Sequence, residues 1–407
     1  MLEFAVPKFW RPYGDYLTVM AFPIAQLIHD EVARRGVIRF TELMDLALYH
    51  PGHGYYLQPK TRTGKAGDFF TNVSVGSVYG QLVADQFAAM HQILGAPTQF
   101  TILEQGAEDA RLALDILERL SQAAPETYSA VTYLVVEPHR SKQRAQQDRL
   151  AAFGSKVTWA GSLEEVRPFT GVAHAHELVD AFPVHLVERQ HPDGWRELGV
   201  TLDGDRLIYA PLPELAPELA AHLKRIPTPP PGPPYRTEVN LAALGWIRDL
   251  AGVLDRGFVL VLDYGYPRDL YYAPHRREGT LSCYRRHRRD HDPLSALGEK
   301  DITAHVDFTS LAEAGLRAGL EVAGFTDQHH FMVGAAEKRL RELSGATETG
   351  GPRGRDARFL RELQTLLHPA HLGTAFRYLL FTRPTLPAPA GFKYARDPRR
   401  ELGLETA

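Results

Sequence analysis

The 407-residue sequence predicts an α/β fold built on a doubly wound, mostly parallel sheet. From Phe100 to Pro384, short apolar stretches rich in β-branched residues alternate with amphipathic stretches of helical period. One apolar stretch, 257–265, is hydrophobic at nearly every position, which is typical of a strand covered by helices on both faces. Alternation of this kind favours parallel strands, because each helix returns the chain to the same end of the sheet.

The N-terminal part of the chain is predicted to be helical. Apolar residues recur at helical spacing in 22–36, which ends at Gly36, and in 40–50, where Thr41 is in position to cap a helix. A glycine-rich and aromatic stretch follows at 51–80 and is too irregular for one element. Long ordered loops often carry function, so this stretch is a candidate for part of a site.

The elements of the sheet follow in alternation, interrupted by two insertions. The predicted strands are 100–106, 131–138, a strand starting near Gly171, 257–265, 321–333 and 375–384. The predicted helices are 110–120, 141–153 and 307–319. The first insertion, 184–240, begins with alternating strands joined by turns and becomes a proline-rich connector. The second, 269–308, is dense in Tyr, His, Arg and Asp and follows a strand end, where open α/β sheets bind ligands.

These patterns divide the chain into successive segments. They are an N-terminal helical segment with a long loop (1–77), the first part of the core (78–200), a hairpin end with a proline-rich insert (201–240), the second part of the core with a loop insert at 268–306 (241–385) and a C-terminal tail (386–407).

The composition excludes several classes of protein. A formal charge of −3 and a pI near 6.7 give no general reason to expect a nucleic-acid partner. The single cysteine, Cys283, excludes an intrachain disulfide and a cysteine-based zinc cage. No apolar stretch approaches the roughly 20 residues of a membrane helix, and the N-terminus does not resemble a signal peptide. A cytoplasmic protein is therefore expected.

The stretch "TILEQGAEDARLALDIL", 101–117, predicts a strand, a turn and a helix, an arrangement that often holds a nucleotide. Its turn contains one glycine, Gly106, and lacks the G-x-G-x-x-G spacing. Glu108 and Asp109 would repel the pyrophosphate of a nicotinamide dinucleotide. S-adenosylmethionine has no phosphate and carries an ammonium and a sulfonium, which an acidic turn attracts. Glu104, at the end of the strand, is placed to meet the ammonium.

The next two predicted strands also end in acidic residues. Glu137 follows the second strand and is suited to accept hydrogen bonds from a ribose diol. After the third strand, His176, Glu177 and Asp180 face the same crevice, where a carboxylate can orient an amine or a guanidinium. The same three residues also fit a capping cluster at the start of a helix, and their spacing does not separate the two interpretations.

Two other patterns carry weaker hypotheses. The histidines show no spacing typical of a metal site, so no metal is expected. The run "YRRHRR", 284–289, could grip phosphate or nucleic acid, although the acids that follow it favour a solvated or acid-paired loop.

Several stretches in the same order resemble the MidA-type S-adenosylmethionine-dependent methyltransferases, a family that includes the mitochondrial arginine methyltransferase that assists assembly of respiratory complex I. The resemblance spans 22–384 and is specific because so many separate stretches take part. They are "ALYHPGHGYY", "GKAGDFFT", "ILEQG", "VVEP", "ELVDAFPVH", "LDYGY" and "DPLSALGEKDITAHVDF".

This resemblance implies a class I methyltransferase, Rossmann-like fold, S-adenosyl-L-methionine as cofactor and a set of site residues. Gly67, Asp68 and Thr71 help close the cofactor site, Glu104 and Gly106 hold the methionine end, and Glu137 with Pro138 holds the ribose. Glu177 and Asp180 lie near the methyl acceptor as the catalytic pair. The predicted partners are a protein substrate, with arginine as the methylated residue, and a second copy of the chain; neither nucleic acid nor a membrane span is expected.

The chain departs from the family in the cofactor turn. The family turn usually reads Glu-Leu-Gly-Pro-Gly-x-Gly, whereas this chain keeps only Glu104 and Gly106 of that pattern. Asp109 is a candidate for a substitute polar contact to the cofactor. In addition, Ser74 stands where the family has a carboxylate, and His176 replaces an asparagine.

Two functions stay open on these residues. The first is a methyltransferase that modifies a protein side chain. The second is a binding or assembly factor that keeps the fold but has lost catalysis, motivated by the altered turn and the large insertions. A nicotinamide-dependent oxidoreductase is disfavoured by the acidic turn.

Overall fold

The computed structural model describes residues 24–58, 71–286, 288–345, 354–368 and 376–404. The chain forms two compact units, and each consists of several separate stretches of sequence. The core unit comprises Phe70–Leu178, Ile247–Gly265 and Phe308–Ala407. The second unit comprises Met1–Phe69, Val179–Trp246 and Tyr266–Asp307. These boundaries differ from those of the segments predicted from the sequence, because each unit is assembled from stretches that are distant in the chain.

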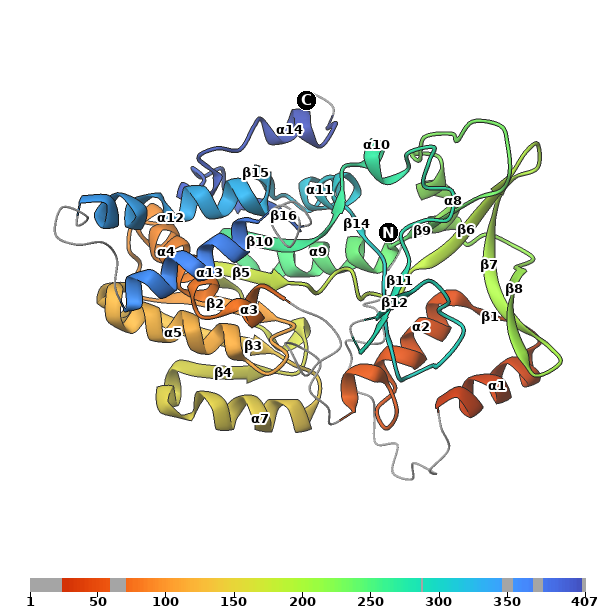
Figure 1. The fold of residues 1–407 in the computed structure, drawn as a ribbon, viewed down its shortest axis with the longest axis horizontal. Coiled ribbons are helices and arrows are strands. Elements are labelled where there is room, and N and C mark those ends of the chain that lie inside the picture. Colours follow the sequence, from red (N-terminus) through yellow and green to blue (C-terminus); the bar gives the residue numbers. More distant parts are fainter. Residues whose placement is uncertain (1–23, 59–70, 287, 346–353, 369–375, 405–407) are drawn as a thin grey trace. The chain divides into compact units, whose positions relative to one another are not determined.

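The core unit contains a twisted, mostly parallel sheet (Figure 1). The strand order is β15-β16-β10-β5-β2-β3-β4. All neighbours from β10 to β4 pair in parallel, and β16 alone runs against both of its neighbours. The bounds are β2 (Phe100–Gln105), β3 (Val131–Val136), β4 (Val157–Ala160), β5 (Phe169–His176), β10 (Leu254–Tyr266), β15 (Glu321–Asp327) and β16 (Phe376–Arg383). This arrangement confirms the predicted class I, doubly wound fold.

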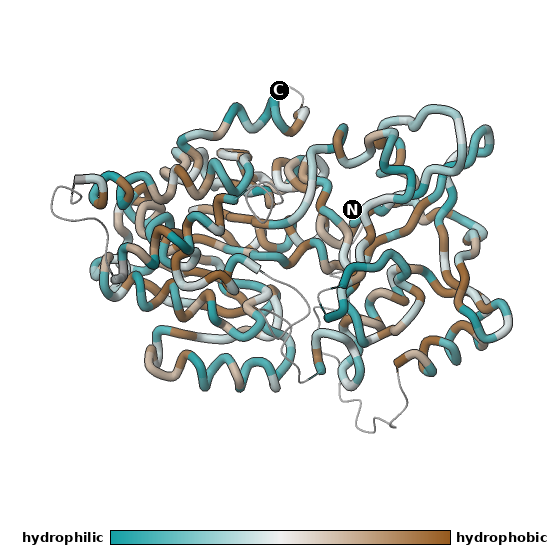
Figure 2. Tube along the Cα trace, viewed as in Figure 1, coloured by the Kyte–Doolittle hydropathy of each residue, from teal (hydrophilic) through white to brown (hydrophobic). Residues whose placement is uncertain are grey.

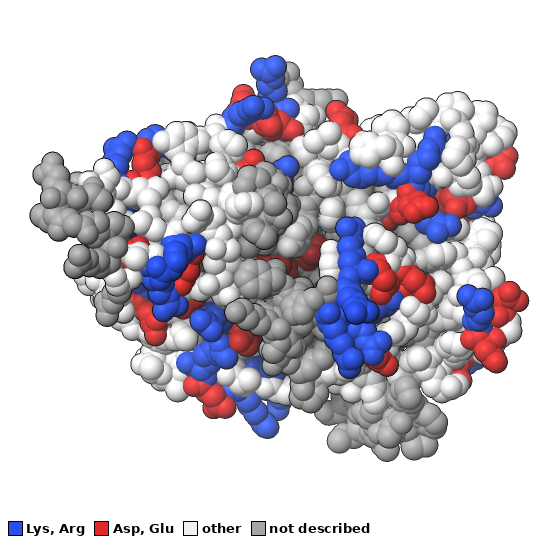
Figure 3. All heavy atoms as spheres, in the orientation of Figure 1, with Lys and Arg blue, Asp and Glu red and all other residues white. Residues whose placement is uncertain are grey.

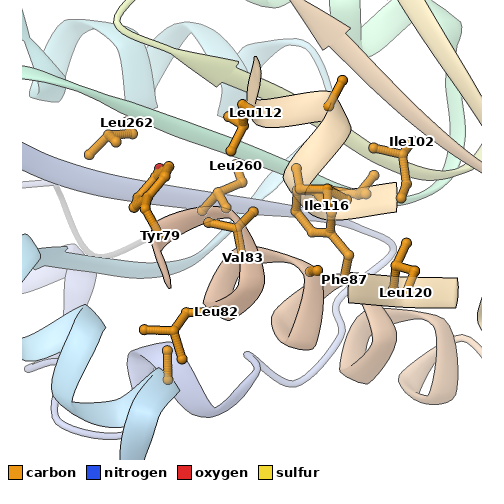
Figure 4. Packing of buried hydrophobic residues seen from close by; sticks show 14 of the residues in the cluster. Tyr79, Leu82, Val83, Phe87, Ile102, Leu112, Ile116, Leu120, Leu260 and Leu262 are labelled. Atoms are coloured by element: carbon orange, nitrogen blue, oxygen red, sulfur yellow. The ribbon is translucent and has the colours of Figure 1, made fainter. Parts of the chain in front are cut away.

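Helices cover both faces of this sheet. On one face, Tyr79 and Phe87 of α4 and Ile116 of α5 pack against Ile102 and Leu260 (Figure 4). On the other, α11 packs so closely that a Cβ on Gly315 would lie 2.5 Å from the Phe381 ring. The helices of this unit are α3 (Asn72–Val75), α4 (Val78–Ile93), α5 (Arg111–Ala123), α6 (Pro125–Ala130), α7 (Arg140–Leu150), α9 (Leu241–Val253, from Ile247 onward), α11 (Phe308–Arg317), α12 (Gln328–Gly345), α13 (Arg355–Leu367) and α14 (Pro398–Glu401).

The buried strands are apolar along their length, whereas α7 is largely hydrophilic (Figure 2). Of its residues, only Gln146 and Leu150 are buried. Leu150 joins the hydrophobic core, and the other buried residue, Gln146, attaches α7 through polar contacts.

The second unit is built on antiparallel strands. Its larger sheet has the order β1-β7-β6-β9, with β8 added to β7, and a smaller sheet has the order β12-β11-β13. The strands are β1 (Ile38–Arg39), β6 (His185–Gln190), β7 (Gly194–Asp203), β8 (Arg206–Pro211), β9 (Tyr235–Val239), β11 (Ser282–Arg285), β12 (Arg288–Asp290), β13 (Asp301–Thr303) and β14 (Val306–Asp307). The helices are α1 (Ile24–Arg35), α2 (Phe40–Tyr49), α8 (Pro217–Leu223) and α10 (Arg268–Tyr271). In the described residues, no helix combines the length and the apolar character needed to cross a membrane.

Most predicted elements are present, and the structure adds others that were not predicted, among them α4, α9 and α13. The hairpins of the first insertion are confirmed as β6, β7 and β8. The predicted strand 321–333 is wrong beyond Asp327, because the chain turns there into α12. Thr41 does not cap α2; instead the Glu42 carboxylate accepts the backbone N–H of Arg39 at 2.9 Å. The short strand β4 was not predicted, because four residues are too few to show a period.

Gly257 is the point of closest approach between β10 and β5. Its φ is +142°, and a Cβ would lie 1.8 Å from the carbonyl oxygen of Gly171. Gly257→Ala is therefore expected to lower the free energy of unfolding by about 3 kcal/mol, because the paired backbones must separate.

Gly252 near the end of α9 provides the matched control, since a Cβ there meets no atom within 4 Å. Gly252→Ala should leave stability unchanged or raise it by up to about 1 kcal/mol. Urea unfolding of both variants measures the difference. Equal stabilities would show that the strands tolerate the added methyl group.

Candidate functional site

The turn after β2 has a backbone conformation that usually requires glycine. Gly106 has a φ of +84°, and a Cβ on it would lie 3.0 Å from Cδ1 of Leu178. Glu108 and Ala110 also have positive φ values, +46° and +57°, although both carry side chains. Left-handed backbone is disfavoured for residues with a Cβ, so contacts elsewhere must hold this turn in place.

Local hydrogen bonds shape the start of α5. The N–H of Ala110 donates to the carbonyl of Ala107 at 2.6 Å, and Oδ1 of Asp109 accepts the N–H of Arg111 at 3.2 Å. The Asp109 side chain thus satisfies one of the free N–H groups at the helix N-terminus.

The two acidic side chains of the turn pair with α7. Oε2 of Glu108 lies 2.6 Å from Nζ of Lys142, and Oδ2 of Asp109 lies 2.9 Å from Nη1 of Arg149. Both carboxylates therefore have a cationic partner within the protein. The predicted contact between Asp109 and the cofactor stays a prediction, and the structure gives this half-exposed side chain a different partner.

Glu104 is buried at the end of β2. Of the described residues, Tyr133 alone forms a hydrogen bond to its side chain, and the hydroxyl donates to Oε2 at 2.8 Å. Burial raises the pKa of Glu104 from 4.5 to about 7, although the Tyr133 hydrogen bond acts in the opposite direction. A nearby cation would stabilise the ionised form of this buried carboxyl group and lower its pKa.

Glu137 lies directly after β3, the strand that neighbours β2. Its Oε1 accepts the N–H of His139 at 3.0 Å, and its Oε2 accepts Nε2 of Gln146 at 3.3 Å. Burial raises the pKa of Glu137, while Lys142, the His139 N–H and Gln146 lower it. Pro138 follows and is half-buried. Parallel pairing of β2 with β3 places Glu104 and Glu137 at the same edge of the sheet.

Glu177 follows β5 on the other side of β2. Its φ is +51°, and its N–H donates to the carbonyl of Leu262 at 2.9 Å. Its Oε1 lies 3.5 Å from Nε2 of His176, and burial lowers the pKa of this imidazole to about 3. His176 is therefore neutral at pH 7, and the pair is not an ion pair.

The other predicted site residues are placed as follows. Asp180 is buried in the second unit, where its carbonyl accepts the N–H of Ala304 at 2.9 Å. Burial raises the pKa of Tyr49, and the negative charges of Asp301 and Asp180 raise it further. Thr71 is buried before α3, and its Oγ1 lies 3.1 Å from Oγ of Ser74. Gly67 and Asp68 lie outside the described residues.

The sequence analysis did not identify several residues that lie near the predicted site residues. Tyr133, Lys142 and Gln146 contact the predicted acids directly. Asn72 of α3 is fully buried, and neither atom of its side-chain amide has a hydrogen-bond partner among the residues that the structure describes. A buried amide without partners is a candidate for ligand contact. No sequence signal marks these residues, because their partners are 9 to 34 positions away in the chain.

The histidines and the basic run at 284–289 carried the two weaker hypotheses from the sequence. Within the described parts of the chain, no three His, Cys, Asp or Glu side chains are arranged to hold a metal ion. In the basic run, 284–285 belong to β11 and 288–289 to β12, which pair with each other, and Figure 3 shows a cluster of basic side chains beside acidic ones in this region. Arg285 pairs with Glu299 at 2.6 Å, which agrees with the acid-paired interpretation.

The raised pKa of Glu104 predicts a pH-dependent stability. Between about 4.5 and about 7 the folded protein retains a proton that the unfolded chain releases, so stability falls as the pH rises through this window. Glu104→Gln should remove this component and melt higher than the parent at pH 8, with a smaller difference at pH 5. Melting temperatures of the ligand-free proteins check this, with the exposed Glu118→Gln as control. The same pH slope in parent and Glu104→Gln would contradict the assignment.

Comparison with known proteins agrees with this arrangement. A family described as "Putative S-adenosyl-L-methionine-dependent methyltransferase" matches residues 82–326. A solved structure from Burkholderia thailandensis, bound to S-adenosyl-homocysteine, is 30% identical with a TM-score of 0.81, over 93% of this chain and 96% of that chain.

Two curated relatives are also similar along most of their length. The protein arginine methyltransferase NDUFAF7 homolog of Drosophila melanogaster, named as mitochondrial, is 26% identical over 88% of this chain and 84% of its own. The human protein arginine methyltransferase NDUFAF7, also named as mitochondrial, is 25% identical over 92% of this chain and 88% of its own. Since the family match covers more than half of the sequence, this chain belongs to the S-adenosyl-L-methionine-dependent methyltransferases of that family.

Proposed function

We propose that this chain transfers the methyl group of S-adenosylmethionine to a nitrogen atom of a protein side chain, and that the side chain is arginine. The observation that carries this proposal is the position of three acidic residues. Glu177, Glu104 and Glu137 stand at the ends of β5, β2 and β3, which are adjacent and parallel in the sheet. The arginine methyltransferase names of the relatives support the choice of acceptor.

The residues of the core unit suit the chemistry of this cofactor. Glu104 has one oxygen held by Tyr133 and the other available for an ammonium group. Gly106 keeps the turn open because it has no side chain. Glu137 presents a buried carboxylate that can accept hydrogen bonds from a diol. The cofactor supplies the methyl group, and these side chains bind and orient it.

Glu177 is the residue that we assign to the acceptor. A guanidinium is a fixed array of donors that binds a carboxylate strongly, and the neutral His176 beside Glu177 does not compete as a cation. Alignment of the nitrogen with the methyl group then contributes most of the rate, since bringing reactants into line removes an entropic barrier. Asp180 is proposed as a second acidic residue for the acceptor, and Gly67, Asp68 and Thr71 as residues that close the cofactor site.

The second candidate is a binding or assembly factor without catalysis. It is favoured by the turn, where Glu108 and Ala110 carry side chains in left-handed conformations and both turn acids pair with α7. Under this proposal the methyltransferase fold supports a partner surface and transfers no methyl group.

We propose a cytoplasmic location and a homodimer from the sequence alone. The mitochondrial names belong to the relatives. Cell fractionation and light scattering of the purified protein test these two proposals.

Glu137→Gln is expected to weaken binding of S-adenosylhomocysteine by about tenfold, because an amide replaces a charged acceptor for the ribose diol. Isothermal titration calorimetry measures the dissociation constant. Glu118→Gln, an exposed change on α5, should bind like the parent. Unchanged affinity in the Glu137 variant would remove this residue from the cofactor site.

Glu177→Gln is expected to bind S-adenosylhomocysteine within about twofold of the parent and to lower methyl transfer by about a hundredfold, because it loses the charge that orients the acceptor. Radiolabelled methyl groups are followed into proteins extracted from cells that lack this gene, and amino-acid analysis identifies methylarginine. Equal labelling by parent and variant would exclude the assigned role. Cofactor binding by the parent without any labelling would favour the second candidate.

A further inference from the structure

Gln146 is a fully buried polar residue on helix α7, whose other buried residue is Leu150. Its Nε2 donates to the carbonyl of Glu108 at 3.0 Å and to Oε2 of Glu137 at 3.3 Å. Its Oε1 accepts the indole N–H of Trp159 in β4 at 3.1 Å. One side chain therefore contacts both the turn after β2 and the carboxylate after β3.

These three partners define the orientation of the amide. The two contacts of Nε2 are acceptors, and the contact of Oε1 is a donor, so the opposite orientation would break all three hydrogen bonds. The contact with Trp159 distinguishes the two possible orientations of the amide, because an indole N–H can only donate and must face the amide oxygen. The amide is held as a donor directed at Glu108 and Glu137.

The same side of α7 holds the turn through charges. Lys142, Gln146 and Arg149 are spaced by four and three residues, which places them on one face of the helix. Lys142 pairs with the Glu108 side chain, while Gln146 binds the Glu108 backbone. The turn has left-handed backbone at Glu108, a conformation that needs external support when the residue is not glycine.

We propose that Gln146 is a positioning residue for the S-adenosyl ligand. Its amide holds the Glu137 carboxylate toward the ribose diol and, through the Glu108 carbonyl, keeps that carboxylate at a constant position relative to the cofactor turn. This inference rests on the assignment of Glu137 to the ribose under the proposed function. Gln146 acts on the ligand indirectly, through Glu137 and the turn after β2.

The chemistry of position 146 limits the alternatives. A glutamate would place a second negative charge beside Glu137 and would lose both donated hydrogen bonds. An apolar residue of similar size would fill the space but leave the carboxylate with one partner fewer. The effect of losing Gln146 should therefore appear in recognition of the diol, beyond any effect on stability.

The experiment compares parent and Gln146→Met for binding of adenosine and 2′,3′-dideoxyadenosine, measured by displacement of S-adenosylhomocysteine. The ratio of the two affinities reports recognition of the diol, and general loosening of the fold changes both affinities alike. We expect the parent to prefer adenosine by about tenfold, and Gln146→Met to lower that preference to nearly one. Its affinity for S-adenosylhomocysteine should fall by a similar factor.

Gln147→Met is the matched control, since Gln147 is the exposed neighbour on the same helix and the substitution is identical. It should keep the parent's preference. If Gln146→Met fails to fold, as judged by its melting curve, Trp159→Phe takes its place, because it removes the hydrogen bond that orients the amide and keeps an aromatic ring at this position. That variant should lose part of the preference.

The outcomes separate this inference from the function on which it rests. If Glu137→Gln abolishes the preference for adenosine and Gln146→Met retains it, the role of Gln146 is overturned and the assignment of Glu137 to the ribose is kept. Absence of the preference in the parent, together with unchanged binding by Glu137→Gln, would overturn the ribose assignment and this inference with it.

Discussion

The polar contacts at one edge of the parallel sheet depend on the burial of two carboxylates, Glu104 and Glu137. A buried carboxyl group is costly in its ionised form unless hydrogen bonds or cations compensate for the lost water. Tyr133 provides a hydrogen bond to Glu104, and Gln146 with the His139 N–H provides two to Glu137. The polar contacts of β3 and α7 follow from this requirement. Under the proposed function, the same two carboxylates bind the ammonium and the diol of the cofactor.

Helix α7 links this edge to the turn that precedes α5. Besides the buried Leu150, the helix is held by Gln146 and by ion pairs from Lys142 and Arg149 to the turn. These contacts compensate for a turn with side chains at positions that suit glycine. The acids of the turn, which in isolation suggest direct attraction of the ligand, contribute instead to the attachment of the turn to α7.

Glu177, which we propose for the acceptor, has a different electrostatic environment. Glu177 has left-handed backbone directly after β5, and its neighbour His176 stays neutral because burial disfavours the imidazolium. The His176 ring therefore adds no positive charge beside the Glu177 carboxylate. Under the proposed function, this agrees with a cationic arginine as the acceptor.

The sequence by itself determined the fold class and the position of the acids along it. Periodicity identifies strands and helices, and the end of a strand in a parallel sheet is a definite place, so Glu104, Glu137 and Glu177 could be assigned to one edge before any coordinates. The boundary at Asp327 was missed, because the apolar residues after it, Phe331 and Met332, suit a buried helix as well as a strand. Only the tertiary structure decided the partners of the acids. Tyr133, Lys142 and Gln146 follow no motif, and hydrogen bonds between residues 9 to 34 positions apart depend on how α7 and β3 pack rather than on local pattern.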